Sequence, residues 1–132
     1  MSSYFGLPAG AAGPFQVLAR GVAVSVTSTA AQAVFTAPQA CVVTACVVRG
    51  PNVALSATTA INLGHTAALT NLISNKVATS LPTNALMNAT TTNTGGVTTG
   101  VATAAGAIVY FSCQVVDPTA VSATVDLLGY VL

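Results

Sequence analysis

The residues that could do chemistry in this chain are three cysteines, one histidine and two aspartates. Cys41 and Cys46 lie five positions apart in the apolar stretch ACVVTACVVRGP, and Cys113 lies in a second apolar stretch. Residues of a regular strand point to alternate faces, so this spacing predicts that Cys41 and Cys46 face opposite ways and neither pair nor share a metal. Cys113 could bridge to either of them, which would leave one thiol free. The simplest interpretation is that all three are small buried side chains.

A zinc site or a catalytic triad would have to use His65, the only histidine. A site with three cysteines and His65 has suitable atom types, but the chain lacks the closely spaced ligand pairs of zinc-binding proteins. A Ser-His-Asp triad needs an oriented carboxylate, and the chain has no G-x-S-x-G elbow for the nucleophile. We therefore expect His65 to form hydrogen bonds locally in a loop or to lie at a subunit contact.

The two carboxylates have simpler roles than catalysis. Asp117 precedes Pro118 and is expected to cap a turn. Asp126 lies among apolar residues and is expected to pair with Arg20 or Arg49, with plain solvation as the alternative. Neither arrangement resembles a glycosidase pair. The glycine-rich stretch TGGVTTG has no lysine and no following helix, so it is not a phosphate loop. The sequence predicts no enzyme, no metal and no cofactor.

Composition narrows the class of protein further. The 132 residues fit one domain, and 53% of them are hydrophobic, which excludes a disordered chain. Only 4% are charged, against roughly 25% in an average soluble domain. Three basic residues are too few for an electrostatic nucleic-acid binder. With a net charge of +1, little repulsion keeps copies apart, so the sequence favours a protein that associates permanently.

The first 14 residues, MSSYFGLPAGAAGP, lack the basic and apolar regions of a signal peptide. Two prolines break this segment, and we expect an extended N-terminal arm that grasps a partner, with a frayed terminus as the alternative. The most apolar window, residues 31–48, is interrupted by proline, glutamine and threonine and lacks basic flanks. No membrane span or membrane partner is predicted.

The patterned stretches are rich in Val, Thr, Ile and Phe, which is typical of strands. The alternation changes phase at Arg20-Gly21, which predicts a β-bulge. Residues 66–74 are predicted to form a short helix or an apolar loop, and residues 92–106 a long loop. The predicted strands cover residues 15–27, 32–37, 40–48, 58–63, 76–81, 85–91, 107–116 and 120–132.

Turns that recur every eight to twelve residues indicate a β-sandwich. We expect one domain, residues 15–132, with a two-sheet antiparallel β-sandwich of jelly-roll type; an immunoglobulin-like sandwich is the alternative. Stretches 40–48 and 107–116 hardly alternate, so each either buries both faces or leaves one apolar face exposed, and we expect exposed faces of these strands to make subunit contacts. The predicted interface residues are Tyr4, Phe5, Leu7, Val43, Val47, Arg49, Val109 and Phe111.

Residues 57–82, ATTAINLGHTAALTNLISNKVATSLP, resemble a pattern of small β-sandwich virion proteins of tailed bacteriophages, of the capsid decoration or cement type. The run Ile61-Asn62-Leu63-Gly64 carries the turn of that pattern, and the low charge and Thr/Ala/Val richness are similar. The resemblance implies a homotrimer or homodimer seated on the outer surface of an icosahedral shell, with the major capsid protein as partner. It also implies synthesis in the host cytoplasm.

The leading prediction is therefore a structural virion protein that binds and stabilises a phage capsid, without nucleic acid or membrane. The alternative is a phage fibre or spike domain, or a carbohydrate-binding β-sandwich. Such modules usually present aromatic platforms, whereas this chain has no tryptophan and its tyrosines, Tyr4, Tyr110 and Tyr130, are not clustered in the sequence.

Overall fold

The computed structural model describes residues 16–65, 68–78, 86–90, 101–120 and 122–132, and this part of the chain contains nine strands and no helix. The predicted arm, residues 1–14, lies outside the described residues. Within the described residues, no helix is long and apolar enough to cross a membrane. The strands are β1 (Gln16–Ser25), β2 (Gln32–Thr36), β3 (Cys41–Arg49), β4 (Ala60–His65), β5 (Ala68–Val77), β6 (Leu86–Thr90), β7 (Val101–Thr103), β8 (Ile108–Val115) and β9 (Ser122–Val131).

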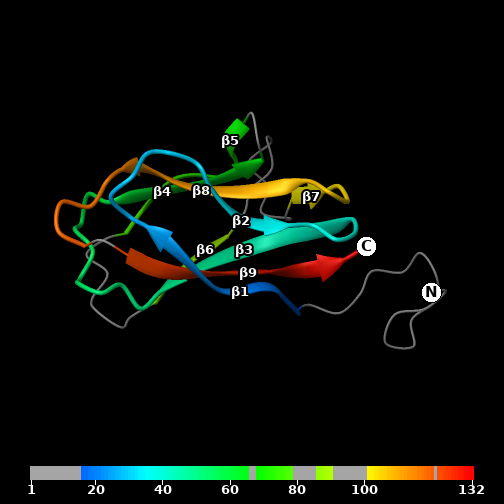
Figure 1. Ribbon diagram of the computed structural model, residues 1–132, viewed down its shortest axis with the longest axis horizontal. Coiled ribbons are helices and arrows are strands. Elements are labelled where there is room, and N and C mark those ends of the chain that lie inside the picture. Colours follow the sequence, from blue (N-terminus) through cyan, green and yellow to red (C-terminus); the bar gives the residue numbers. More distant parts are fainter. Residues whose placement is uncertain (1–15, 66–67, 79–85, 91–100, 121) are drawn as a thin grey trace.

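The strands form two antiparallel sheets that pack face to face (Figure 1). One sheet has the order β1-β9-β3-β6, with the short β7 also paired to β3, and the other has the order β2-β8-β4-β5. With β7 set aside, β1 pairs with β9, β2 with β8, β3 with β6 and β4 with β5. This nested pairing is one long hairpin rolled into two layers, which is a jelly roll. The predicted fold class is confirmed.

The core lies between the sheets and consists of inward-facing aliphatic side chains and one large aromatic ring. The largest side chains with almost no exposed area are Phe111, Leu55, Ile61, Leu63, Leu72, Leu127, Val26, Val43, Val48, Val109 and Val125. They come from both sheets and from the loop after β3, so the single chain closes one continuous interior.

A β-bulge interrupts β1 where the sequence predicted it. The register between β1 and β9 shifts between Ala19 and Val22, and Gly21 has a φ of 66°. A residue with a side chain is strained in that left-handed region, which explains the glycine. Leu18 and Ala19 pack against the core before the bulge and Val22 and Val24 after it, whereas Val17 is exposed.

A second bulge, in β3, was not predicted from the sequence. The register between β3 and β9 shifts between Val43 and Ala45, so Thr44 is the extra residue. Its hydroxyl donates a hydrogen bond to the carbonyl of Leu128 at 3.2 Å. Gly129 lies opposite this bulge, and a Cβ there would collide with the carbonyl oxygen of Val42. Close approach of the two backbones therefore requires glycine at this position.

The predicted helix over residues 66–74 is wrong, because β5 occupies residues 68–77 and pairs with β4. Leu69, Leu72 and Ile73 have helical spacing, but two register shifts in the hairpin place both Leu72 and Ile73 in the interior. Cross-strand pairing has overridden the local pattern. The first two residues of the predicted strand 76–81 belong to the end of β5, and residues 79–81 lie outside the described part.

The predicted long loop, residues 92–106, contains the three-residue strand β7 at its end. This strand pairs with the first part of β3, beyond the point where β6 stops, so β6 and β7 share one edge of β3. The glycine-rich stretch 94–100 lies outside the described residues.

Candidate assembly surfaces

The three cysteines are free thiols in the interior. The prediction that Cys41 and Cys46 face opposite ways is wrong, because the bulge at Thr44 resets the alternation between them. Cys46 and Cys113 belong to the core cluster, and Cys41 faces a cavity between the sheets. Among the described residues, no group of three or more potential ligands could hold a metal ion. The interpretation of the cysteines as packing side chains is confirmed.

Burial controls the protonation of these thiols. It raises the pKa of Cys41, and it raises the pKa of Cys46 to about 12, with a smaller contribution from the Asp126 carboxylate. Burial and the nearby Asp117 carboxylate raise the pKa of Cys113 to about 11. The thiolate is the nucleophilic form, so burial lowers the reactivity of all three thiols near neutral pH, and of these only Cys41 lines a cavity.

His65 ends β4 and joins the two sheets through neutral partners. Its Nε2 lies 2.9 Å from the Thr103 hydroxyl on β7, and its Nδ1 lies 2.9 Å from the amide nitrogen of Asn71 on β5. Asn71 Nδ2 can only donate, so Nδ1 accepts and Nε2 carries the proton toward Thr103. Partial burial lowers the pKa of His65. The histidine therefore forms local hydrogen bonds, which is one of the two predicted alternatives, but it ends strand β4 and does not lie in a loop. Its hydrogen-bond partners among the described residues include no carboxylate.

Asp117 is the most buried charged group, with an exposed fraction of 2%. One oxygen accepts hydrogen bonds from the Ser56 amide and the Thr59 hydroxyl, both at 2.6 Å. The other accepts from the amides of Thr119 and Ala120, at 2.9 and 2.6 Å. The predicted turn cap is confirmed, but no local pattern indicated the bonds from Ser56 and Thr59, which are about 60 residues away.

These bonds keep Asp117 ionised. Burial alone would raise the pKa of Asp117, because a carboxylate loses hydration in the interior. The hydrogen bonds from Thr59, Ser56, Ala120 and Thr119 outweigh that effect and hold its pKa well below the usual range. The backbone amide of Asp117 also donates to the Val26 carbonyl at 2.9 Å, so this residue joins three separate segments at one end of the sandwich.

Asp126 pairs with Arg49 on the outer side of the β1-β9-β3-β6 sheet, as one of the two predicted alternatives. Arg49 Nε lies 2.8 Å from Asp126 Oδ2, and Gly21 in the β1 bulge donates its amide to Oδ1 at 2.6 Å. The Arg49 hydrogen bond is the main cause of the lowered pKa of Asp126, and Arg20 contributes through its charge. Two of the three basic residues thus lie on this one face.

Three of the predicted interface residues are core residues instead. Val43, Val109 and Phe111 have no exposed area in the single chain. Strands β3 and β8 lie in the middle of their sheets, and their inner faces are covered by the opposite sheet. The single chain therefore buries these three side chains, which the sequence had predicted to lie at a contact with another subunit. Val47 and Arg49 remain partly exposed on the outer face.

The remaining predicted interface residues are in the arm. Tyr4, Phe5 and Leu7 lie outside the described residues, so their role stays a prediction.

The two outer faces differ in chemistry. On the β1-β9-β3-β6 sheet, Val47 lies opposite Asp126, Ala45 opposite Leu128 and Val42 opposite Tyr130. Paired residues share a face, and the alternate residues of β9, such as Val125 and Leu127, are in the core. This outer face is therefore largely apolar, with Arg49 and Asp126 as an ion pair at one end.

The outer face of the β2-β8-β4-β5 sheet carries a cluster of amide side chains, although Val77 and Val115 at strand ends of this sheet are also exposed. Asn62 on β4 donates its side-chain amide to Gln114 on β8 at 3.1 Å and accepts the amide of Asn75 on β5 at 2.8 Å. Tyr110 is on β8 and Tyr130 on β9, in different sheets. The two described tyrosines therefore do not form one aromatic platform.

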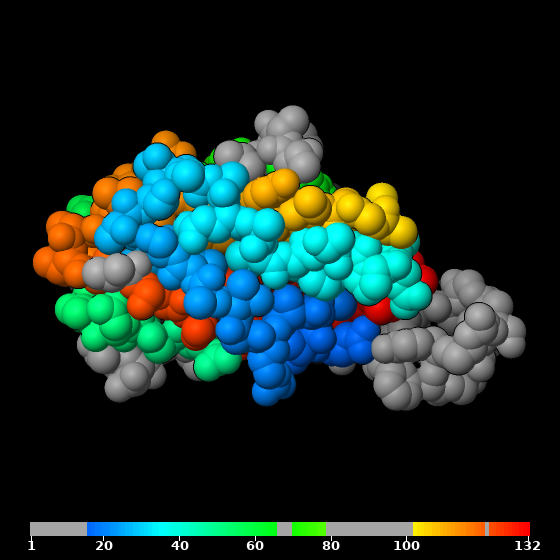
Figure 2. Space-filling model, in the orientation of Figure 1, coloured from blue at the N-terminus to red at the C-terminus, as the bar shows by residue number. Residues whose placement is uncertain are grey.

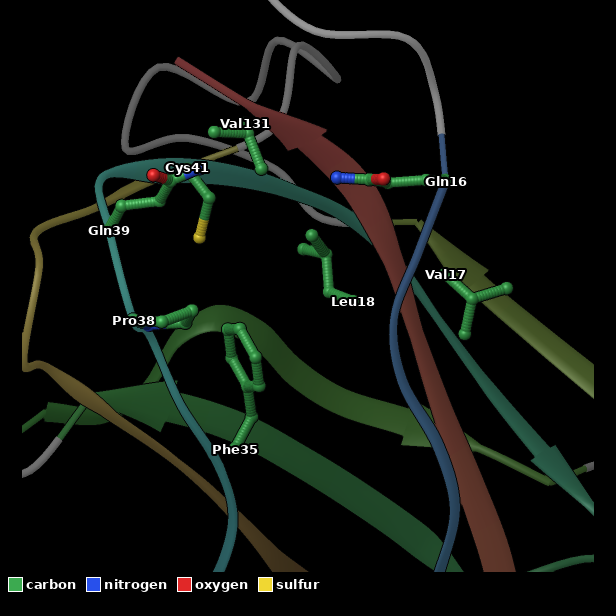
Figure 3. A pocket seen from close by; sticks show the side chains of 8 residues that line it. All are labelled: Gln16, Val17, Leu18, Phe35, Pro38, Gln39, Cys41 and Val131. Atoms are coloured by element: carbon green, nitrogen blue, oxygen red, sulfur yellow. The ribbon is translucent and has the colours of Figure 1, made fainter. Parts of the chain in front are cut away.

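A cavity of about 240 Å³ opens at the seam where β1 of one sheet lies beside β2 of the other (Figure 3). Figure 2 shows these two segments, in blue and cyan, side by side across the front of the molecule. The side chains of Leu18, Phe35 and Cys41 point into the cavity, whereas that of Val17 points away. We call this cavity the seam pocket; it is lined by Gln16, Val17, Leu18, Phe35, Pro38, Gln39, Cys41 and Val131.

No family model and no characterised protein matches this sequence. A structural match was found to a chain of the capsid asymmetric unit of cyanophage Pam1, with a TM-score of 0.61 and 18% sequence identity. The alignment covers 98% of this chain and 94% of that chain. The two chains therefore share a fold over almost their whole length.

Proposed function

We propose that this protein is a structural virion protein of the head decoration or cement type, which binds a phage capsid as an oligomer. The observation that carries this proposal is the match over 98% of the chain to a component of a phage capsid. The expected site is the outer surface of the shell, the expected partner is the major capsid protein, and synthesis would take place in the host cytoplasm. No catalytic step is proposed.

The extent of the match favours an accessory subunit. Because the alignment covers 98% of one chain and 94% of the other, the two chains are of nearly equal length. A small β-sandwich with few charges suits a subunit that binds over the contacts between capsid proteins that have already assembled. A subunit that binds only the assembled lattice stabilises it by mass action, by about 2.7 kcal/mol per site when its free concentration is 100 times Kd.

The outer face of the β1-β9-β3-β6 sheet is the surface we propose for attachment. It combines partly exposed apolar side chains, including Val47, with two arginines and one carboxylate. Asp126 neutralises Arg49, so the exposed Arg20 leaves this face with a net positive charge. We therefore expect the partner surface to be apolar with an acidic group. The outer face of the other sheet would point away from the shell.

Cosedimentation with purified heads of the virus that encodes the chain, prepared without this protein, tests the proposal. The chain should pellet saturably with the heads and stay in solution without them. Arg20→Glu should weaken binding about tenfold or more, since it places a like charge against the expected acidic group. Lys76→Glu makes the same change of charge on an exposed residue of the other sheet and should bind normally. Failure of the natural chain to pellet would contradict the proposal.

Oligomer formation needs a separate measurement, because the single chain already encloses its own core. Sedimentation equilibrium of the purified protein should give a dimer or trimer mass at micromolar concentration. A monomer at all concentrations that still binds heads would refute the oligomer and leave attachment to the shell in place.

A further inference from the structure

The seam pocket is lined only by uncharged residues, six of them apolar and two of them glutamines. Leu18 and Phe35 pack against the core on one side and border the cavity on the other, and both are only partly buried. A volume of about 240 Å³ is below the roughly 300–1,000 Å³ of pockets for drug-sized ligands. The pocket therefore suits one or two apolar side chains of a peptide.

The chain carries such side chains next to the pocket in sequence. Gln16, the first residue of β1, lines the pocket, so residues 1–15 join the domain at its wall. Within that segment, Tyr4, Phe5 and Leu7 are three large apolar side chains within four residues. Leu7 precedes Pro8, which disfavours helix and biases this position to an extended backbone. The chain from Phe5 to Gln16 has eleven residue-to-residue steps and, when extended, spans up to about 36 Å.

We propose that the seam pocket binds residues 4–7, YFGL, of a second copy of this chain. If the segment is extended from Gln16, Phe5 lies up to about 36 Å from its own pocket, within reach of a neighbouring copy. Because the chain has a low net charge, electrostatic repulsion between two copies is weak. The inference rests on the proposed oligomer and names the contact that would hold it together.

Cys41 makes this contact measurable, because its sulfur faces the cavity (Figure 3). The variant Phe5→Cys with Cys41→Ala has a thiol on the arm and none in the pocket. When it is mixed with the natural chain, a disulfide between position 5 and Cys41 can form only between two copies. Diamide is the oxidant, non-reducing electrophoresis follows the covalent dimer, and peptide mass spectrometry identifies the joined positions.

The matched control is Ala9→Cys with Cys41→Ala, which places the thiol beyond Pro8 in the same segment. Docking should make the link from position 5 form at least about tenfold faster than the link from position 9, because docking raises the local concentration of the thiol. Equal rates would indicate random collision and overturn the proposal. A disulfide that forms only within one chain of the single variant Phe5→Cys would also overturn it, because the arm would then fill its own pocket.

Cosedimentation with heads, run on the same variants, separates this inference from the proposed function. Head binding without the fast cross-link overturns the seam-pocket contact and leaves the function standing. The fast cross-link without head binding supports the contact and contradicts the function.

Discussion

The two ends of the sandwich are held together by different kinds of contact. At one end, where Figure 1 shows the orange turn between β8 and β9, the buried carboxylate of Asp117 binds donors from its own turn and from the distant segment 56–59. At the other end, the seam pocket separates β1 from β2, and only neutral groups around His65 tie β4 and β5 to β7. The first end is closed by ionic hydrogen bonds within the chain, and the second leaves apolar surface open.

From this difference we infer which end takes part in the proposed assembly. A carboxylate with four short bonds to main-chain and hydroxyl donors has little capacity left for a partner. Partly buried leucine and phenylalanine side chains beside a cavity gain free energy when further apolar atoms cover them. We therefore assign stability to the Asp117 end and subunit contact to the seam-pocket end.

The largest expected effect comes from Asp117→Asn. The substitution keeps the shape of the side chain but turns one acceptor oxygen into a donor that faces other donors. We expect a loss of about 2–4 kcal/mol in the free energy of unfolding, since buried donors are left without acceptors. Urea unfolding followed by circular dichroism measures it. A loss below 1 kcal/mol would show that this end is not held by the carboxylate.

The acid response of the same residue follows from its lowered pKa. In the unfolded chain Asp117 has a pKa of about 3.9, whereas in the folded chain its pKa is well below that range. The stabilisation is complete above the unfolded pKa and disappears as the pH falls through the folded pKa. Stability should therefore drop below about pH 4, and Asp117→Asn should remove most of that drop. An unchanged acid profile in the variant would assign the drop to other groups.

At the seam-pocket end, Leu18→Ala should cost less, about 1–2 kcal/mol. Leu18 is only partly buried and already borders a cavity, so its removal creates less new void than at a fully enclosed site. The same urea titration gives the value. If Leu18→Ala destabilised the chain more than Asp117→Asn, the contrast between the two ends would be reversed.

The smallest effect is expected from protonation of His65. Its folded pKa is lowered, so the unfolded chain takes up the proton first as the pH falls below about 6.5. Stability is complete above that pH, decreases as the pH falls toward the folded pKa, and is constant below it. The melting temperature should fall by roughly 1–2 °C between pH 7.5 and 5. His65→Gln should abolish this step, because the chain has one histidine.

The sequence predicted those features that depend on neighbours along the chain. The sandwich follows from strand composition and turn spacing, and the β1 bulge follows from the phase change at Arg20-Gly21. The pairing of Asp126 was expected because the chain has so few charged partners.

Features that depend on distant segments were missed. The bonds from Ser56 and Thr59 to Asp117 have no local signature, since both donors belong to a loop distant in sequence. The bulge at Thr44 arises from pairing with β9 and invalidates the face assignment of Cys41 and Cys46. The seam pocket also needs both sheets, although its proposed occupant was visible as an apolar cluster in residues 4–7.

The central part of the proposed function is that the protein stabilises a capsid. The temperature at which heads rupture measures this stabilisation. Heads prepared without the protein are heated with increasing amounts of the purified chain, and release of DNA is followed by dye fluorescence. The rupture temperature should rise with concentration and level off when all sites are filled. A rupture temperature that stays constant up to saturating concentrations would contradict the account.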